Sequence, residues 1–316
     1  MHKCFLAQAC HRGQPAPLTR DAASSSDAPH HRHTMVVTVD GVEMLKVDAH
    51  THILPATAWP ETPGVKLRCI HEAEGPFAAR LEWEDGRLFR KITKSCFDAT
   101  AVLEECDAHG VDVQVLCTVP VMFNYHLEPE VGKGWARFLN DDMAATVKVN
   151  PKRLIGLGTL PLQDPAAAVV ELRRCVEELG LRGVQVGSHV DAHCPEEASG
   201  KRNMALCAPE LRCVWREAER LGCAVLVHPW DMQPWCPGQY WLPWLVGMPS
   251  ETALAGASFI LGGVLDECPG LKVREKNEAS PLRNRRLPWS SPRFSPTPPP
   301  NNRSCSRTAA GRCRSS

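Results

Sequence analysis

The chain has 316 residues, enough for one large α/β domain or two smaller ones, and its 43% hydrophobic and 23% charged residues are ordinary for a globular protein. No stretch reaches the roughly 18 uninterrupted apolar residues of a membrane span, so we expect no membrane-spanning segment. The formal net charge of zero hides an asymmetry, because residues 274–316 carry ten Lys/Arg and two Asp/Glu. This stretch is therefore basic, and the remainder of the chain is acidic.

Both ends of the sequence lack the patterning of a folded domain. Residues 1–34 are rich in His, Pro, Ala and Ser without periodicity, and they lack the apolar core of a secretory signal. Residues 274–316 hold seven prolines and almost no aliphatic side chains. They can therefore bury too little apolar surface to offset the entropy lost when the chain becomes ordered. We predict disorder over 1–44, a folded domain over 45–273 and a disordered basic tail over 274–316. Without a recognisable module in the tail, we expect no nucleic-acid partner.

The fifteen cysteines form no Cys-x-x-Cys pair and are odd in number. Together with the missing secretory signal, this favours free thiols in a reducing compartment, which we take to be the cytosol.

Between these ends, short apolar runs alternate with helical stretches. The first predicted strand begins at 44–47 and runs into the segment Asp48–His52, and the later strands are predicted at 111–116, 154–160, 183–187, 224–228 and from 271 onward. The predicted helices lie at 98–109, 133–147, 164–179, 209–221 and 251–265. Residues 191–206 look like an insertion before the fourth of these helices.

Five strand–helix units in one direction predict a parallel sheet with crossover helices. A doubly wound sheet and a (β/α)8 barrel both fit this order. The first strand is not followed by Gly-x-Gly-x-x-Gly, and the chain has no phosphate-binding loop, which argues against nucleotide binding.

The most informative motif is Asp48-Ala49-His50-Thr51-His52, which closes the first strand. Residues i and i+2 of a strand share one face, so His50 and His52 present two imidazoles side by side. His228 ends the fifth strand. In a barrel all three would lie at the carboxyl rim of the strands, where barrel active sites are built. Three imidazoles and a water molecule form a plausible open zinc site.

Five sequence blocks extend this pattern: Val47–Pro55, Cys117–Phe123, Ile155–Pro161, Val227–Met232 and Tyr240–Pro249. With these blocks the chain resembles the amidohydrolase superfamily, and within it the 2-amino-3-carboxymuconate 6-semialdehyde decarboxylase family. The His-x-His motif is shared by the superfamily, whereas the last two blocks are particular to these decarboxylases. The resemblance covers residues 44–273.

The resemblance implies an α/β fold of the metal-dependent (β/α)8 TIM-barrel type, incomplete here, with about five strand–helix units and the start of a sixth strand. It implies His50, His52 and His228 as zinc ligands and Arg90 as the residue that grips a substrate carboxylate. Trp244 matches a pocket-wall tryptophan, although an aromatic side chain that fills a packing gap fits equally well.

The resemblance also implies an activity and partners. The expected reaction is zinc-dependent decarboxylation of a small dicarboxylate semialdehyde, 2-amino-3-carboxymuconate 6-semialdehyde, to 2-aminomuconate 6-semialdehyde in tryptophan (kynurenine) catabolism. Members of the family are homodimers, so a homodimer is expected here. We read Asp231 as support for its loop, and we expect no metal role for five further histidines, namely His71, His109, His126, His189 and His193.

The sequence also departs from the family pattern. Family members carry a catalytic His at the end of a sixth strand and an Asp zinc ligand after an eighth, and neither has a counterpart after Val273. We therefore assign no general acid/base residue, read the chain as truncated at its C-terminal side, and expect weak zinc binding with little or no decarboxylation.

Two alternatives stay open at this point. One is a catalytically inactive fragment that binds metal or a partner chain. The other is a zinc hydrolase of the same superfamily, which the block Val227–Met232 disfavours.

Overall fold

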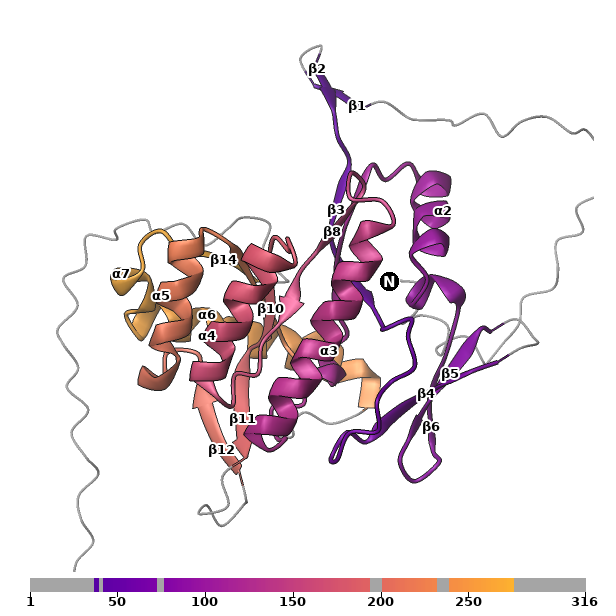
Figure 1. Cartoon of the computed structure of the whole chain (residues 1–316). Coiled ribbons are helices and arrows are strands. Elements are labelled where there is room, and N and C mark those ends of the chain that lie inside the picture. The colour runs from indigo at the N-terminus through magenta and orange to yellow at the C-terminus, as the bar shows by residue number, and fades with distance from the viewer. Residues whose placement is uncertain (1–36, 40–41, 73–76, 194–200, 232–238, 276–316) are drawn as a thin grey trace, which may run out of the picture. The chain divides into compact units, whose positions relative to one another are not determined.

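The computed structural model describes residues 37–39, 42–72, 77–193, 201–231 and 239–275 (Figure 1). Most of the stretches predicted to be disordered, 1–44 and 274–316, lie outside these ranges. Within them, no helix is both long and apolar enough to cross a membrane. All nine cysteines whose state the structure describes are free, as predicted.

The centre of the fold is a series of parallel strands, as predicted. The strands are β3 (Val47–Ile53), β7 (Val113–Thr118), β8 (Leu154–Gly156), β9 (Gly158–Thr159), β10 (Gly183–Gly187), β13 (Ala224–His228) and β14 (Lys272–Glu275). They pair in the orders β3-β7-β8 and β9-β10-β13-β14, all in parallel. Between β8 and β9, the N–H of Leu157 donates to the carbonyl of Leu116, which keeps the series continuous.

The strand order decides between the two folds that the sequence left open. Neighbouring strands follow chain order throughout the described series, as in a (β/α)8 barrel. In a doubly wound sheet, the order of the strands would instead reverse near the middle of the sheet. The series is not closed within the described residues, because β3 and β14 stand at its two ends. The fold is thus a partial barrel of the α/β class.

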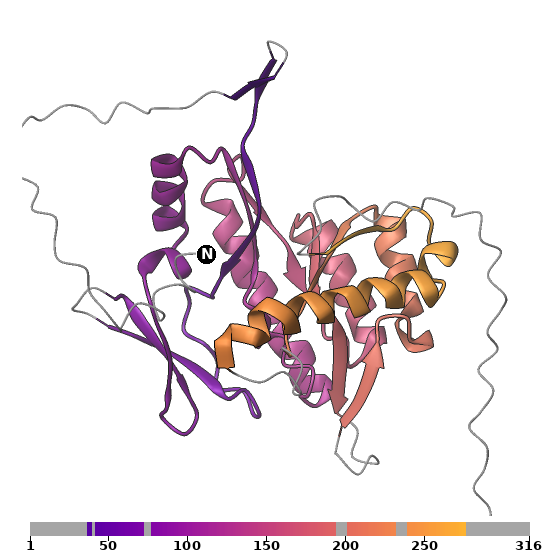
Figure 2. The ribbon, with the colours of Figure 1, turned by 180° about the vertical axis from the view of Figure 1, so that it is seen from behind.

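The helices follow the strands in the predicted alternation. They are α2 (Ala99–His109), α3 (Pro129–Lys148), α4 (Pro165–Arg173), α5 (Arg212–Leu221), α6 (Met248–Leu261) and α7 (Val264–Glu267). Figure 2 shows α6 from the side opposite to the view of Figure 1. Short turns of 3-10 helix are η1 (Lys94–Cys96), η2 (Pro120–Met122), η4 (Pro209–Leu211) and η5 (Gln239–Trp241), and π-helical turns are η3 (Arg174–Glu178) and η6 (Pro243–Gly247).

Three antiparallel elements accompany this series. They are the sheet β4 (Leu67–His71), β5 (Ala79–Trp83) and β6 (Leu88–Ile92), the hairpin β11 (His189–His193) and β12 (Lys201–Ala205), and the pair β1 (Val37–Val39) and β2 (Val42–Met44). The hairpin occupies the region read as an insertion. The pair β1–β2 corrects the prediction that all of 1–44 is disordered, because alternating β-formers flank an Asp-Gly dipeptide there. The sixth parallel strand also runs to Glu275, two residues past the predicted boundary.

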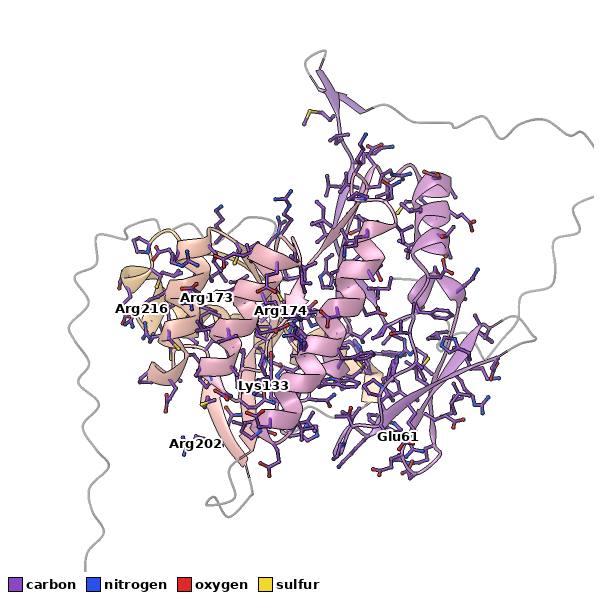
Figure 3. The ribbon with its side chains drawn as sticks, viewed as in Figure 1. Glu61, Lys133, Arg173, Arg174, Arg202 and Arg216 are labelled. Carbon is purple, nitrogen blue, oxygen red and sulfur yellow. The ribbon has the colours of Figure 1, made fainter. Side chains whose placement is uncertain are left out.

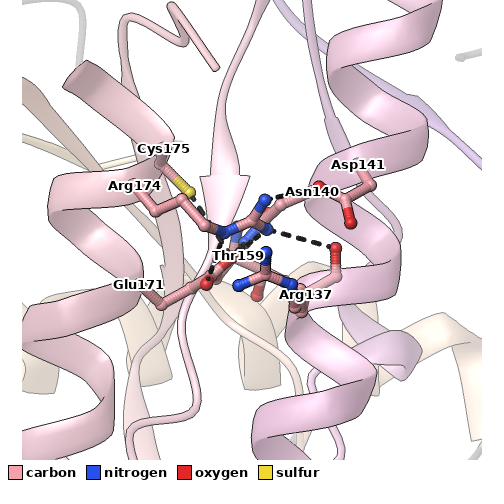
Figure 4. Close-up of polar contacts among 7 residues, drawn as sticks. All are labelled: Arg137, Asn140, Asp141, Thr159, Glu171, Arg174 and Cys175. Carbon is pink, nitrogen blue, oxygen red and sulfur yellow. Dashed lines mark hydrogen bonds and ion pairs between the residues drawn. The ribbon is translucent and has the colours of Figure 1, made fainter. Parts of the chain in front are cut away.

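A buried polar network joins α3 and α4 to β9 (Figure 4). Asn140 accepts a hydrogen bond from the N–H of Thr159 at 2.7 Å and donates to the carbonyl of Thr159 at 2.9 Å and to Glu171 at 2.6 Å. Arg174 donates to both carboxylate oxygens of Glu171, at 2.9 and 2.7 Å, and pairs with Asp141. Hydrogen bonding to Glu171 raises the pKa of Arg174, so the guanidinium stays charged.

A second network ties α4 to α5. Glu217 accepts hydrogen bonds from Arg173 at 2.6 Å and from Arg220 at 2.7 Å. These bonds lower the pKa of Glu217 to about 2, because two guanidinium groups stabilise the ionised carboxylate.

Candidate metal centre

The three predicted histidines converge on the inner face of the strand series. In β13, Val225 and Val227 pack into the core under the helices, whereas Leu226 contacts Cys117 from the opposite face. His228 has the same parity as Leu226 and therefore lies on that inner face. In β3, Ile53 packs toward the helices, so His52 and His50 face inward. The fold thus brings together histidines from distant parts of the chain, with His52 and His228 176 residues apart in sequence.

The ring nitrogens of the three histidines all lie within 4.8 Å of one another. The Nε2 atoms of His52 and His228 are 3.1 Å apart. His52 Nδ1 lies 2.8 Å from the carbonyl oxygen of Thr118, and His228 Nδ1 lies 2.5 Å from that of Pro229. A carbonyl oxygen only accepts hydrogen bonds, so each Nδ1 is the donor. In the neutral rings of His52 and His228, the free lone pair is therefore on Nε2, and the two Nε2 atoms face each other.

This donor set fits a divalent metal. Two lone pairs at this distance repel each other unless a cation lies between them. Zn–N bonds of about 2.0–2.1 Å in a tetrahedral site place neighbouring nitrogens roughly 3.3 Å apart. The observed 3.1 Å is close to that spacing. In such a site the carbonyls of Thr118 and Pro229 would be the outer hydrogen-bond partners that orient histidine ligands.

Cys117 lies directly beside the histidines and was not singled out from the sequence. It is the parallel-strand partner of His52, and its Sγ donates to the carbonyl of Thr51 at 3.2 Å. The same sulfur lies 3.8 Å from His50 Nδ1 and 3.5 Å from His52 Nδ1. Cys117 therefore packs against the outer nitrogen of both rings and limits their rotation.

A buried carboxylate anchors the loop that follows His228. Glu251 on α6 is 2% exposed and accepts hydrogen bonds from the N–H groups of Trp230 at 2.7 Å and Asp231 at 3.3 Å. It also accepts the hydroxyl of Ser188, the residue that follows β10. One carboxylate thus holds the ends of two neighbouring strands. A sequence signal existed, since Glu251 is the single charged residue between positions 242 and 263.

The aromatic rings of Tyr125 and Trp230 pack together beside this loop. Gly187 pairs with His228 across β10 and β13, and a Cβ on it would lie 2.7 Å from the Trp230 ring and 2.9 Å from that of Tyr125. Glycine is thus required by the close approach. Its N–H donates to the hydroxyl of Tyr125 at 2.8 Å. Burial raises the pKa of Tyr125, so its phenol is neutral.

The two predicted substrate residues lie on other elements. Arg90 is on β6, in register with Leu81, and is half-buried. Trp244 lies in η6, with its ring centroid 4.8 Å from that of Trp241. The indole N–H of Trp244 is buried and has no acceptor among the described residues. The substrate roles of Arg90 and Trp244 stay predictions.

The other described histidines do not belong to the triad of His50, His52 and His228. The triad is the one cluster of three or more potential metal ligands in the described part of the chain. His189 stacks on Trp230, with its Nδ1 3.7 Å from Glu251 and its Nε2 4.0 Å from Asp231. His109 contacts its own helix, His126 contacts the carbonyl of Gly64, and His71 packs on Phe97. The side chain of His193 lies outside the described residues.

Comparison with known families places this fold and site in context. The Amidohydrolase family model (Amidohydro_2) matches residues 47–273, and the chain belongs to this family. The match covers β3, β7 and β13, from which the three histidines and Cys117 come. The fold class predicted from the sequence is thereby confirmed.

Within the family, the chain is similar in sequence to decarboxylases. It is 44% identical over 236 residues to the 2-amino-3-carboxymuconate-6-semialdehyde decarboxylase of Dictyostelium discoideum, a match that covers 72% of this chain and 61% of that protein. It is 34% identical over 275 residues to the enzyme of that name from Caenorhabditis elegans, covering 72% and 67%. The chain thus spans less than two thirds of the Dictyostelium protein.

A solved structure adds information on the metal. The chain is 26% identical to a dihydroxybenzoic acid decarboxylase from Polaromonas, with a TM-score of 0.52 over 57% of this chain and 55% of that one. That structure contains bound manganese and the inhibitor 2-nitroresorcinol.

Proposed function

We propose that this chain carries the metal-binding part of a decarboxylase site. The substrate is 2-amino-3-carboxymuconate 6-semialdehyde and the product 2-aminomuconate 6-semialdehyde, a step of tryptophan catabolism. The observation that carries the proposal is the convergence of His50, His52 and His228, with ring nitrogens within 4.8 Å, at the carboxyl ends of β3 and β13. The choice of substrate is supported by the similarity to two proteins named 2-amino-3-carboxymuconate-6-semialdehyde decarboxylase.

The metal we propose is zinc. Imidazole nitrogens suit zinc, whereas manganese prefers carboxylate, carbonyl and water oxygens. The described donors are three nitrogens. The manganese in the Polaromonas structure makes a metal comparison necessary. We expect this chain to bind zinc more tightly than manganese.

The residues around the site have distinct tasks in this proposal. When bound, the metal lowers the pKa of a coordinated water and polarises a substrate oxygen. His52 and His228 keep Nε2 available because their Nδ1 protons are committed to backbone carbonyls. Arg90 supplies a planar guanidinium that pairs with a substrate carboxylate. Trp244 offers its buried indole N–H as a donor and its ring as a wall.

Metal analysis tests the ligand assignment. The purified chain, dialysed against zinc, should retain about one zinc, and His228→Ala should lose it. His109→Ala is the matched control, because His109 bonds within its own helix. Retention of zinc by His228→Ala, or its loss from His109→Ala alone, would contradict the assignment.

An ultraviolet assay for loss of the substrate chromophore tests the reaction. Any turnover should require His50, His52 and His228. The sequence-based expectation is weak zinc binding with little or no turnover, and rapid turnover by the zinc-loaded chain would show it to be wrong. Bound zinc without turnover would support the inactive-fragment alternative, and cleavage of an ester or amide would support the hydrolase.

A further inference from the structure

Three consecutive polar residues of α3 reach three different segments of the chain. Asn140 bonds the backbone of β9, and Asp141 pairs with Arg174 of η3, which Figure 3 labels beside α3. Asp142 bonds the loop that follows β3, the strand of the His-x-His motif. Successive side chains on a helix are about 100° apart, which lets one turn of α3 hold all three segments.

The Asp142 carboxylate accepts hydrogen bonds from the loop after β3. Its Oδ1 accepts the hydroxyl of Thr57 at 3.0 Å and the N–H of Thr57 at 3.3 Å. Its Oδ2 accepts the N–H of Ala56 at 3.3 Å. Asp142 is 9% exposed, whereas Ala56 and Thr57 are exposed, so the loop covers the carboxylate. Within the described part of the chain, these loop groups are its hydrogen-bond donors, and no cationic side chain is among them.

The burial of this carboxylate depends on the loop. A charged group away from water is costly unless hydrogen bonds compensate for the lost solvent. Another charge on the same helix, Lys133 (Figure 3), remains half-exposed and pairs with Glu130 on the helix surface. Asp142 has no such exposed position, and its charge is stabilised by the loop N–H groups and hydroxyl. Because the same bonds also fix the loop, the two elements hold each other.

The loop in turn follows a strand whose pairing is irregular at the histidines. The register of β3 on β7 shifts between Asp48 and Thr51, and His50 lies within this interval. Strand pairing alone therefore specifies the position of His50 less well than it does in a regular ladder. A hold on the chain directly after His52 compensates for this.

Two kinds of contact from α3 supply that hold. Ile53, which directly follows the motif, lies in one hydrophobic cluster with Met143, the neighbour of Asp142 on α3. The next N–H, of Leu54, donates to the carbonyl of Cys96 at 2.9 Å. The Asp142 bonds to the loop come two residues later. The end of β3 is thus held by apolar packing, a backbone bond and a buried carboxylate in succession.

The same arrangement occurs at the other strand that carries a proposed ligand. Glu251 of α6 is buried and accepts the N–H groups of Trp230 and Asp231, in the loop after His228. In both places a buried helix carboxylate accepts two successive N–H groups of the loop that leaves the strand. The two carboxylates come from different helices, so the likeness is a feature of the site and not of one element.

We propose that Asp142 is a positioning residue of the metal site, which holds the end of β3 so that His50 and His52 meet His228. This inference deepens the proposed function, and its metal-binding part rests on it. Asp142 does not touch the metal. It acts through β3, because a working site needs its ligands held within roughly 0.5 Å of the productive geometry.

Hydrogen exchange of the metal-free full chain, measured by mass spectrometry, tests the hold on the loop itself. Asp142→Ala removes the acceptor of all three bonds, so peptides over 48–58 should exchange at least about 10-fold faster. Peptides over 224–231 should keep the wild-type rate. Asp142→Asn keeps one carbonyl oxygen for Thr57 and should restore most of the protection. Thr57→Val removes one donor without altering α3, and it should change exchange in the same direction by less.

Asp141→Ala is the matched control. Asp141 is the neighbouring carboxylate on the same helix, but it is half-exposed and pairs with Arg174 instead of the loop. This variant should leave exchange over 48–58 and zinc affinity at their wild-type values.

Zinc affinity and the cobalt-substituted chain connect the loop to the metal. Loss of an outer partner of a metal ligand typically costs about 10- to 100-fold in affinity, and Asp142 acts one step further out. We therefore expect a loss of about 10-fold in Asp142→Ala and recovery in Asp142→Asn. In the proton NMR spectrum of the cobalt form, the shifted Nδ1 proton signal of His52 should move, while that of His228 should stay.

Three results would overturn the proposal. They are wild-type exchange over 48–58 in both Asp142→Ala and Thr57→Val, faster exchange there with unchanged zinc affinity and cobalt spectrum, and equal effects in Asp141→Ala. A wild-type chain that binds no zinc, with exchange over 48–58 still accelerated in Asp142→Ala, would count against the proposed function and support the hold on β3.

Discussion

Replacing Glu251 by leucine should loosen the loop that carries His228. The carboxylate accepts the N–H groups of Trp230 and Asp231 and the hydroxyl of Ser188. Leucine is of similar size but accepts none of these hydrogen bonds. The variant therefore leaves three donors without their acceptor, at the ends of β10 and of β13, the strand that carries His228.

The magnitude follows from the burial of these donors. Each buried donor left unsatisfied costs about 1–3 kcal/mol, and the half-exposed Asp231 N–H can turn to water, so we expect a loss of roughly 3–6 kcal/mol in the free energy of unfolding. The carbonyl of Pro229, which orients His228, lies on the loop that Glu251 holds, and loss of such a partner typically weakens metal binding by about 10- to 100-fold, so Glu251→Leu should weaken zinc binding by up to that factor. Glu251→Gln keeps a carbonyl oxygen for the two N–H groups, so it should recover most of the zinc affinity.

Zinc affinity measured by competition with a chromophoric chelator, together with urea unfolding, separates the two effects. The d–d spectrum of the cobalt-substituted chain reports on the geometry at His228. Thr252→Val is the matched control, since Thr252 is the next buried polar residue and bonds Met248 within α6. Wild-type zinc affinity and cobalt spectrum in Glu251→Leu would refute the positioning role, even if stability fell.

Three further predictions concern the surrounding fold. Glu171→Ala leaves the buried Arg174 without its main partner and should cost about 3–5 kcal/mol in urea unfolding, with partial recovery on adding Arg174→Met. Because the pKa of Glu217 is lower in the folded chain, its carboxylate stabilises the fold at pH values above 4.5, and this stability is lost as the pH falls from 4.5 to about 2. In Glu217→Gln, this loss of unfolding free energy on acidification should be smaller by on the order of 1–2 kcal/mol. Iodoacetamide at pH 8 should label the exposed Cys213 and spare Cys175, whose thiol pKa is raised by burial; peptide mass mapping checks this, and early labelling of Cys175 would contradict it.

The parallel strand–helix units could be predicted because their boundaries are local. Asp98 and Asp164 each accept two N–H groups of the helix they begin. Gly110 and Gly222 end helices in the left-handed conformation, with φ of 66° and 63°. Such caps depend on a few adjacent residues, so the sequence alone reveals them.

The antiparallel elements could not be found in the same way. The strands of the β4–β6 sheet are five residues each and are held by cross-strand pairing rather than by strong local propensity. The Asp85-Gly86 dipeptide, with Gly86 at φ 80°, was a usable hairpin signal. Arg90 lies on the strand that follows this turn.

Convergence of the histidines could be anticipated only through the barrel order, whereas their environment required the structure. That Cys117 packs on two imidazoles depends on the pairing of β3 with β7. That Glu251 anchors the His228 loop depends on the placement of α6 against β13. Long-range register of this kind has no short sequence signature.

The placement of the three histidines also links metal binding to folding. In the described residues β3 pairs on one side only, with β7, and its first three residues are exposed. His228 lies instead on β13, which is paired on both sides, and is 2% exposed. An ion held by all three imidazoles would cross-link the edge strand to the interior of the series. Since a site of this kind does not exist in the unfolded chain, its binding free energy adds to the stability of the folded state, and it acts most on β3.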